Sequence, residues 1–316
     1  MKKLMYLISA IAGAVGFSTA ANADISVSGS GSLAVVNDGA DATTDAYNAS
    51  GVAFALSTTT SNGMGISMSM GISEASDDGD LNVTGGDAVT FSTGGATIVI
   101  GGVGTVGAGT GNVGGVNGDY VDIATVAGAA VNDIAVTSGD GFTLSTAMGG
   151  ATVTIGYVAD SVALGNAGDS EMNLTNATST AAGATLSMPM GAMTTTVGFA
   201  NADTTTESET SVGGSVSLAA GAGTLTVGMN QSALTDGAGG TSTAMGATYA
   251  MSLDADTSLS VGFNNTKDET NNNTTTEINL SRSLGGGASV FIDVENVSGD
   301  GANTGTAFAL GSSFSF

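Results

Sequence analysis

Gly305-Thr306-Ala307-Phe308-Ala309-Leu310-Gly311-Ser312-Ser313-Phe314-Ser315-Phe316 closes the chain. Its large apolar side chains fall two residues apart, so they share one face of an extended strand. The opposite face has only alanine, glycine and serine. An exposed edge strand of this kind invites aggregation in a soluble protein. The stretch is therefore either the edge of a β-sandwich or the closing strand of a larger sheet.

Alternating apolar and small polar residues run through the rest of the chain and are broken at intervals by turn residues. Every second break is short and rich in glycine, which favours tight β-hairpins. The short breaks are Asn62-Gly63, Gly94-Gly95, Gly149-Gly150, the turn around Pro189, Gly221–Gly223, Asp254–Asp256 and Gly285–Gly287. The alternate breaks are longer and polar, as at Asp38–Asp45, Glu74–Asp80 and Ser298–Asn303. Short turns at one rim and long loops at the other are typical of a barrel that spans a membrane.

This pattern predicts an all-β fold, a transmembrane antiparallel up-and-down β-barrel of about 16 strands. Numbers from about 14 to about 18 stay open, because Val131–Gly139 and Phe142–Met148 can form one strand or two. The face opposite the apolar one is Thr, Ser, Gly, Asn or Ala in each strand. We therefore expect a water-filled lumen lined by small polar side chains, without bulky residues.

Four of the strands that run from a short turn to a long loop share a repeat in which a large residue follows a glycine near the loop. The four large residues are Tyr157, Phe199, Met229 and Phe263. They keep the apolar phase of their strands, so we expect them to face outward at one height. Because three of them are aromatic, they predict an interfacial girdle. A soluble sandwich or a β-solenoid gives no reason for this alignment.

The N-terminus has the pattern of a secretory signal peptide. Lys2 and Lys3 precede an apolar run from Leu4 to Phe17, and Ala21-Asn22-Ala23 fits a cleavage site. We expect cleavage after Ala23, which divides the chain into a signal peptide (1–23) and a barrel domain (24–316). No later stretch approaches the roughly 18 apolar residues that a spanning helix needs.

Charge and residue usage exclude several classes of function. Cleavage would remove two of the four basic residues and none of the 28 acidic ones, leaving only Lys267 and Arg282 and a net charge of −26. Nucleic acid is excluded as a partner, because nothing could neutralise its phosphates. The chain has no Cys and no His, so it lacks His-based triads, thiol nucleophiles and the usual zinc ligands. We expect no catalytic residues, no cofactor and no metal site.

The acidic loops are interpreted as solvated. Glu74–Asp80 has the carboxylate density of a calcium loop but lacks the spacing of an EF-hand. The other external acids are expected on a solvated outer rim: Asp160, Asp169, Glu171, Asp203, Glu207, Glu209, Asp268 and Glu269. We expect Lys267 in an external loop. Arg282 is in phase with Ile278 and Leu280, so we expect it to face outward near the opposite rim and to snorkel.

The closing strand resembles the last strand of Gram-negative outer-membrane barrels, whose assembly signal has a glycine, two residues, and then aromatics two apart. Gly311, Phe314 and Phe316 match that form. Over the whole mature chain, the strand pattern and the loop asymmetry resemble the general diffusion porins of Gram-negative outer membranes. The resemblance implies a homotrimer surrounded by outer-membrane lipid and inserted by the barrel assembly machinery, which reads the closing strand.

The resemblance also implies that the third long loop, Gly107 to about Ala130, folds into the barrel. Its polar residues Asp119, Tyr120 and Asp122 would then form the pore constriction, with Asp133 on the adjoining strand; the alternative is that these acids are solvated loop charges. In the family such carboxylates usually face a cluster of arginines, which this chain lacks.

Asp293 and Glu295 are out of phase with their apolar neighbours, so we expect them to face the lumen. Carboxylates in a confined aqueous pore raise the local concentration of cations. The sequence therefore predicts a passive diffusion channel for small hydrophilic solutes and ions, with a weak preference for cations. The alternative is a structural or adhesive β-rich surface protein without channel activity.

Overall fold

The computed structural model describes residues 23–37, 44–74, 81–85, 88–104, 138–160, 179–204, 208–234, 240–269, 271–300 and 304–316. Within these ranges the chain forms 17 β-strands. They are β1 (Ala23–Asn37), β2 (Asp45–Thr59), β3 (Gly65–Glu74), β4 (Leu81–Gly85), β5 (Ala88–Thr93), β6 (Ala96–Gly104), β7 (Ser138–Met148), β8 (Ala151–Asp160), β9 (Ser179–Met190), β10 (Met193–Thr204), β11 (Ser208–Ala220), β12 (Gly223–Leu234), β13 (Gly240–Ser252), β14 (Thr257–Lys267), β15 (Asn272–Gly285), β16 (Ala288–Gly299) and β17 (Gly305–Ser315). No helix among the described residues is long and apolar enough to cross a bilayer.

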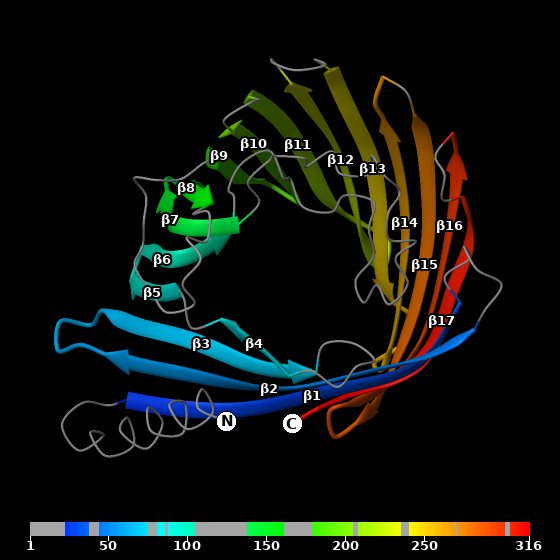
Figure 1. Ribbon diagram of the computed structural model, residues 1–316, viewed down its shortest axis with the longest axis horizontal. Helices are drawn as coiled ribbons and strands as arrows, with labels where there is room; N and C mark the ends of the chain where they lie inside the picture. The colour runs from blue at the N-terminus through cyan, green and yellow to red at the C-terminus, as the bar shows by residue number, and fades with distance from the viewer. Residues whose placement is uncertain are drawn as a thin grey trace.

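The strands close into a barrel, because β1 pairs antiparallel with β2 on one side and with β17 on the other. Figure 1 shows this ring from one end. Both β4 and β5 pair with β3, so they are two pieces of one interrupted strand. The 17 described strands therefore make a closed barrel of 16, which confirms the predicted fold class and strand number. Of the ambiguous stretch, residues 138–148 form the single strand β7, and 131–137 lie outside the described residues.

Glycine closes several of the tight turns at one rim of the barrel. Gly149 and Gly150, between β7 and β8, have φ values of 60° and 90°. A side chain with a Cβ is strained at such angles, whereas glycine is not. These hairpin turns fall where the sequence predicts them. At the opposite rim the strands are joined by longer segments, most of which lie outside the described residues.

Side chains alternate between the two faces of the wall, as β16 illustrates. Val290 and Ile292 are 38% and 46% exposed, whereas Phe291 and Asp293 are 2% and 0% exposed. The exposed phase has the large apolar residues of the strands, so the outer face is apolar. The buried phase faces the interior of the barrel.

The inner face is not uniformly small and polar, so that expectation is wrong. Phe291 is buried there with Ala34, Val297, Ala307 and Ala309. Its ring lies over Gly311, where an added Cβ would be only 2.6 Å from Phe291 Cζ. The small residues of β17 thus make room for a large one of β16. A second buried apolar cluster on the inner face consists of Val103, Val158, Ala181, Ala200 and Ala202.

The seam between β1 and β17 joins the two ends of the barrel. Gly29 N–H donates to the Phe316 carbonyl and Phe316 N–H donates to the Gly29 carbonyl, both at 3.0 Å. Gly31 is the direct partner of Phe314. A Cβ on Gly29 or Gly31 would collide with the ring of Phe316 or Phe314, respectively. The two rings therefore cover two glycines of the first strand on the outer face.

Candidate functional site

Among the described residues, four buried carboxylates lie on the inner face of the barrel wall. Glu209 of β11, Glu277 of β15 and Glu295 of β16 are 3%, 4% and 7% exposed, and Asp293 of β16 is 0% exposed. Glu277 is the direct cross-strand partner of Glu295. Three of the four acids therefore gather on two neighbouring strands.

Neutral polar side chains surround these acids. Asn279 of β15 is the direct partner of Asp293 and is 3% exposed. On β11 and β12, Ser211 Oγ donates to Ser232 Oγ across 2.9 Å, and both residues are buried. The described part of the inner face thus has buried hydroxyl, amide and carboxylate groups on these strands.

A cavity of about 500 Å³ opens against another part of the wall, where β16, β17, β1, β2 and β3 meet. Seven serines contribute to its lining: Ser30, Ser32, Ser50, Ser73, Ser289, Ser313 and Ser315. Ser289 and Ser313 share a hydrogen bond of 2.7 Å between their hydroxyl oxygens. This part of the wall is polar but uncharged.

The structure describes only two of the six residues predicted for the pore. Asp293 and Glu295 lie on the buried face of β16, opposite Ile292. Asp119, Tyr120, Asp122 and Asp133 lie outside the described residues.

Two further inner-face acids were not recognised in the sequence. Glu209 was expected on a solvated rim, and this is wrong. Strand β11 already begins at Ser208, so Glu209 belongs to the strand, and its side chain is buried on the inner face of the wall. Glu277 carried a usable signal, since it is out of phase with Ile278 just as Asp293 is with Ile292. The same alternation rule would have found it.

The two basic residues of the barrel domain lie away from these acids. Lys267 is the last residue of β14 rather than a loop residue, and it is exposed in the same phase as Phe263. Arg282 is exposed near the turn that follows β15, as expected from its phase. Neither Lys nor Arg occurs on the inner face of the described strands. Among the described residues, no three acidic side chains are grouped closely enough to hold a metal ion by themselves.

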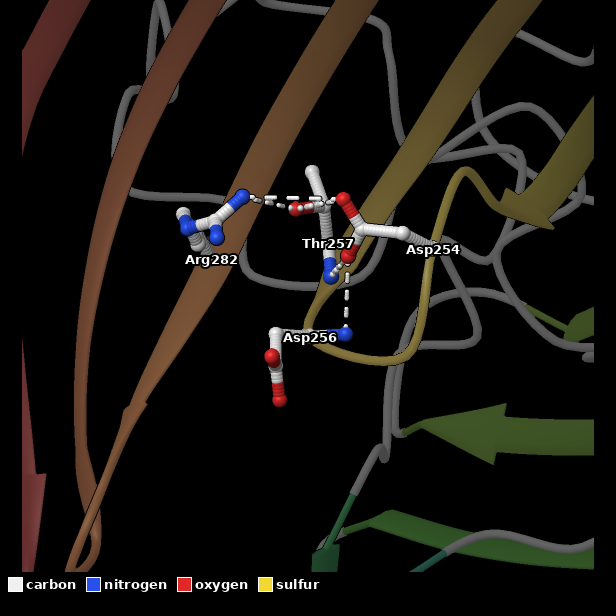
Figure 2. A network of polar contacts seen from close by, with 4 residues as sticks. All are labelled: Asp254, Asp256, Thr257 and Arg282. Atoms are coloured by element: carbon white, nitrogen blue, oxygen red, sulfur yellow. Dashed lines mark hydrogen bonds and ion pairs between the residues drawn. The ribbon is translucent and has the colours of Figure 1, made fainter.

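Arg282 belongs to a network at the turn between β13 and β14 (Figure 2). Its guanidinium lies 3.5 Å from Asp254 Oδ2, and both side chains are 55% exposed. Asp254 Oδ1 accepts hydrogen bonds from the backbone N–H groups of Asp256 and Thr257 at 2.9 and 2.8 Å. The hydrogen bond from Asp256, followed by that from the Thr257 hydroxyl, lowers the pKa of Asp254 below its ordinary value of 3.8, and Arg282 contributes least. The network fixes a turn and does not face the interior acids.

The four large residues near the loops lie in the outward phase. Phe199, Met229 and Phe263 are 51%, 64% and 44% exposed. Tyr157 stacks against Phe142 of the neighbouring strand, with ring centroids 6.5 Å apart. The rings of Phe314 and Phe316, which are 53% and 78% exposed, lie at the other end of the wall.

Comparison with known proteins connects this barrel to a family. The family model described as Gram-negative porin matches residues 9–302 of the chain. No curated protein matches it.

Several solved structures resemble the barrel at low sequence identity. In-vitro folded OmpT of Vibrio cholerae in its trimer form has a TM-score of 0.73 at 11% identity, over 93% of this chain and 99% of that one. Salmonella typhi OmpF, solved with daunomycin, has a TM-score of 0.66 at 11% identity, over 93% and 97% of the two chains. A mutant of Rh. blastica porin has a TM-score of 0.57 at 18% identity, over 93% and 100%. At such identities the similarity establishes the fold alone.

Proposed function

The chain belongs to the Gram-negative porin family, and from this premise we propose that it forms a passive diffusion channel for small hydrophilic solutes and ions in the outer membrane. The observation that supports the proposal is a closed barrel of 16 strands with an apolar outer face and a largely polar inner face. Side chains cannot fill a barrel of this width, so water occupies the remaining space. Solutes cross it by diffusion, without catalysis or a cofactor.

A weak preference for cations is the second part of the proposal. It is supported by the excess of acidic residues in the barrel domain, which has 28 acidic residues and only Lys267 and Arg282 as basic ones, and by the absence of Lys and Arg from the inner face of the described strands. Carboxylates along a confined aqueous path concentrate cations and exclude anions. We assign the constriction to Asp119, Tyr120 and Asp122, with Asp133 beside them, on the resemblance of their segment to the third loop of porins.

The proposal also covers how the channel reaches and occupies its membrane. A signal peptide, cleaved after Ala23, directs export. Gly311, Phe314 and Phe316 form the signal by which the barrel assembly machinery inserts the chain. Tyr157, Phe199, Met229 and Phe263 act as a girdle at the outer-membrane lipid interface. We propose a homotrimer, which the trimer form of one similar structure favours.

Solute permeation in proteoliposomes tests the channel. Vesicles that contain the refolded full chain should swell in isotonic solutions of small uncharged sugars, and the rate should fall as the sugar becomes larger. Vesicles with the same amount of heat-unfolded chain are the control. Folded, inserted barrels that cause no swelling would contradict the proposal and favour a structural or adhesive surface protein.

Matched charged solutes test the preference for cations. Vesicles should swell faster with a small organic cation than with an organic anion of the same size. Because the constriction is assigned to Asp119 and Asp122, the D119N/D122N variant should reduce this difference while still admitting uncharged sugars. A difference unchanged in that variant would reject the constriction residues but leave the channel itself intact.

A further inference from the structure

A groove of about 700 Å³ lies on the outer face of the barrel wall, where β10 to β14 adjoin (Figure 1). With the exception of one threonine, the outward-phase residues that line it are apolar. The groove is hollow because two of them are small and have large neighbours. Gly214 of β11 pairs directly with Val197 of β10 and Met229 of β12. Ala247 of β13 pairs directly with Phe263 of β14.

The outer face becomes polar just beyond the groove, on the side of the long loops. Met245, at the end of the groove, pairs directly with Asn265, whose amide donates to the Thr274 hydroxyl at 3.0 Å. Thr243 is the next outward residue of β13 and pairs directly with Lys267. Alternate residues of a strand are about 7 Å apart. The surface therefore changes from apolar side chains to amide, hydroxyl and ammonium groups over a short distance.

Lys267 is exposed and has no ion pair among the described residues. The two acids that follow it are directed elsewhere. The Asp268 carboxylate accepts hydrogen bonds from the backbone N–H and the side-chain amide of Asn271, at 2.6 and 3.2 Å. The Glu269 carboxyl carbon lies 3.6 Å from the place that a Cβ of Gly240 would take, in the inner phase of β13. The ammonium group on the outer face can therefore accept an anionic partner.

We propose that this groove binds an anionic phospholipid, with an acyl chain over Gly214 and Ala247 and the phosphate at Lys267. A phospholipid has the two parts that the surface requires, in the same order: an apolar chain and, at one end of it, a negative charge. Contacts with the chain alone give no preference among lipids, because the bulk bilayer is equally apolar. The preference comes from the headgroup. This inference rests on the proposed function, since it requires the outer face to lie in a membrane.

Native mass spectrometry of the refolded full chain, released from a mild detergent, tests the headgroup. The detergent contains equal amounts of phosphatidylglycerol and phosphatidylcholine with the same acyl chains. The native barrel should retain phosphatidylglycerol in preference, and K267Q should bind it about fivefold more weakly, the loss expected for one basic residue at a membrane surface.

Arg282 is the matched control for the charge. It is exposed in the same outward phase, but it lies near the opposite rim and is 3.5 Å from Asp254. R282Q should therefore retain phosphatidylglycerol as the native chain does. Equal losses in K267Q and R282Q would mean that charge attracts lipid without a site, and would overturn the proposal. A native barrel that retains the two lipids equally would also overturn it.

Filling the groove tests the place of the acyl chain. A247F should reduce the retained phosphatidylglycerol, whereas V212F should not, because Val212 is exposed on the same face outside the groove. Heat-modifiable gel migration establishes that each variant is folded, and A247L replaces A247F if that variant does not fold. Unchanged lipid retention in the filled variant would overturn the proposal, and a simultaneous loss of oligomers would assign the groove to a second copy of the chain.

Solute permeation separates this inference from the proposed function. K267Q and A247F should admit small sugars into vesicles as the native barrel does, because neither residue faces the lumen. Barrels that retain phosphatidylglycerol as expected but admit no sugar would contradict the channel and leave the lipid site intact. Barrels that admit sugar but show no preference between the two lipids would do the reverse.

Discussion

Asp254 makes two kinds of interaction that differ in how much they stabilise the fold. Its ion pair with Arg282 joins two side chains that are each 55% exposed, and such pairs contribute little because water screens them. Its hydrogen bonds from two backbone N–H groups fix the turn itself. We therefore expect D254A to lower the unfolding temperature measurably and R282Q to leave it nearly unchanged. Equal losses in the two variants would mean that the ion pair, not the turn, matters.

The same carboxylate predicts a dependence on pH. Hydrogen bonds lower the pKa of Asp254 in the folded barrel below 3.8, so the folded state favours the charged form. Its stabilising effect is fully present above the ordinary pKa and is lost as pH falls through the lowered one. The difference in unfolding temperature between the native barrel and D254N should be constant from neutral pH down to about 5 and disappear in more acidic buffer. A difference that grows on acidification would contradict the assigned direction.

Phe291 is a buried aromatic residue on the inner face of the barrel, where small polar side chains in contact with water were expected. It is 2% exposed and packs over Gly311, so F291A should leave a cavity and cost about 3–5 kcal/mol. Phe308 of the neighbouring strand is 41% exposed on the outer face, which makes F308A the matched control. The free energies of unfolding in urea from lipid vesicles should differ strongly between the two variants. Equal values would mean that Phe291 does not pack against the wall.

At the scale of whole strands, the seam between β1 and β17 depends on glycines that the closing aromatics cover. A Cβ at Gly31 would meet the ring of Phe314, whereas a Cβ at Gly51 of β2 would have its nearest atom, Ile72 O, at an ordinary 3.4 Å. We expect G31A to cost about 1–3 kcal/mol, the usual penalty for overpacking. G51A should cost much less in the same unfolding measurement. A neutral G31A would show that the ring moves freely and does not fasten the seam.

The alternation of faces along β12 gives a test of which side meets lipid. Val227 is 39% exposed in the outward phase, and Thr226 is in the opposite phase. A lysine near the bilayer midplane on a lipid-facing position costs about 2–4 kcal/mol. V227K should therefore destabilise the barrel by roughly that amount, and T226K far less, in refolding from urea into vesicles. The reverse order would invert the assignment of the two faces.

For the molecule as a whole, local pattern was enough to predict the architecture but not the interior. Apolar side chains that recur at every second residue indicate the strands and the polarity of their two faces, and glycine-rich interruptions between them indicate the turns. What fills the inner face depends on contacts between distant residues, such as Ala34 with Phe291, which no local window contains. Strand ends were also misjudged at Glu209 and Lys267, because hydrogen-bonded ladders continue beyond the apolar alternation into polar sequence. Glu277 could have been predicted to face the interior, because it is out of phase with the apolar residue Ile278.

The most direct test of an open, cation-preferring barrel is planar-bilayer conductance of the refolded full chain under a salt gradient. The channel proposed above should give stepwise increases in conductance, grouped in threes for the proposed homotrimer, with a reversal potential of the sign that cation flow gives. Steps with a reversal potential of zero or of the opposite sign would keep the channel and reject its cation preference. Folded, inserted protein that gives no steps would contradict the account at its centre and leave a closed barrel with a structural role.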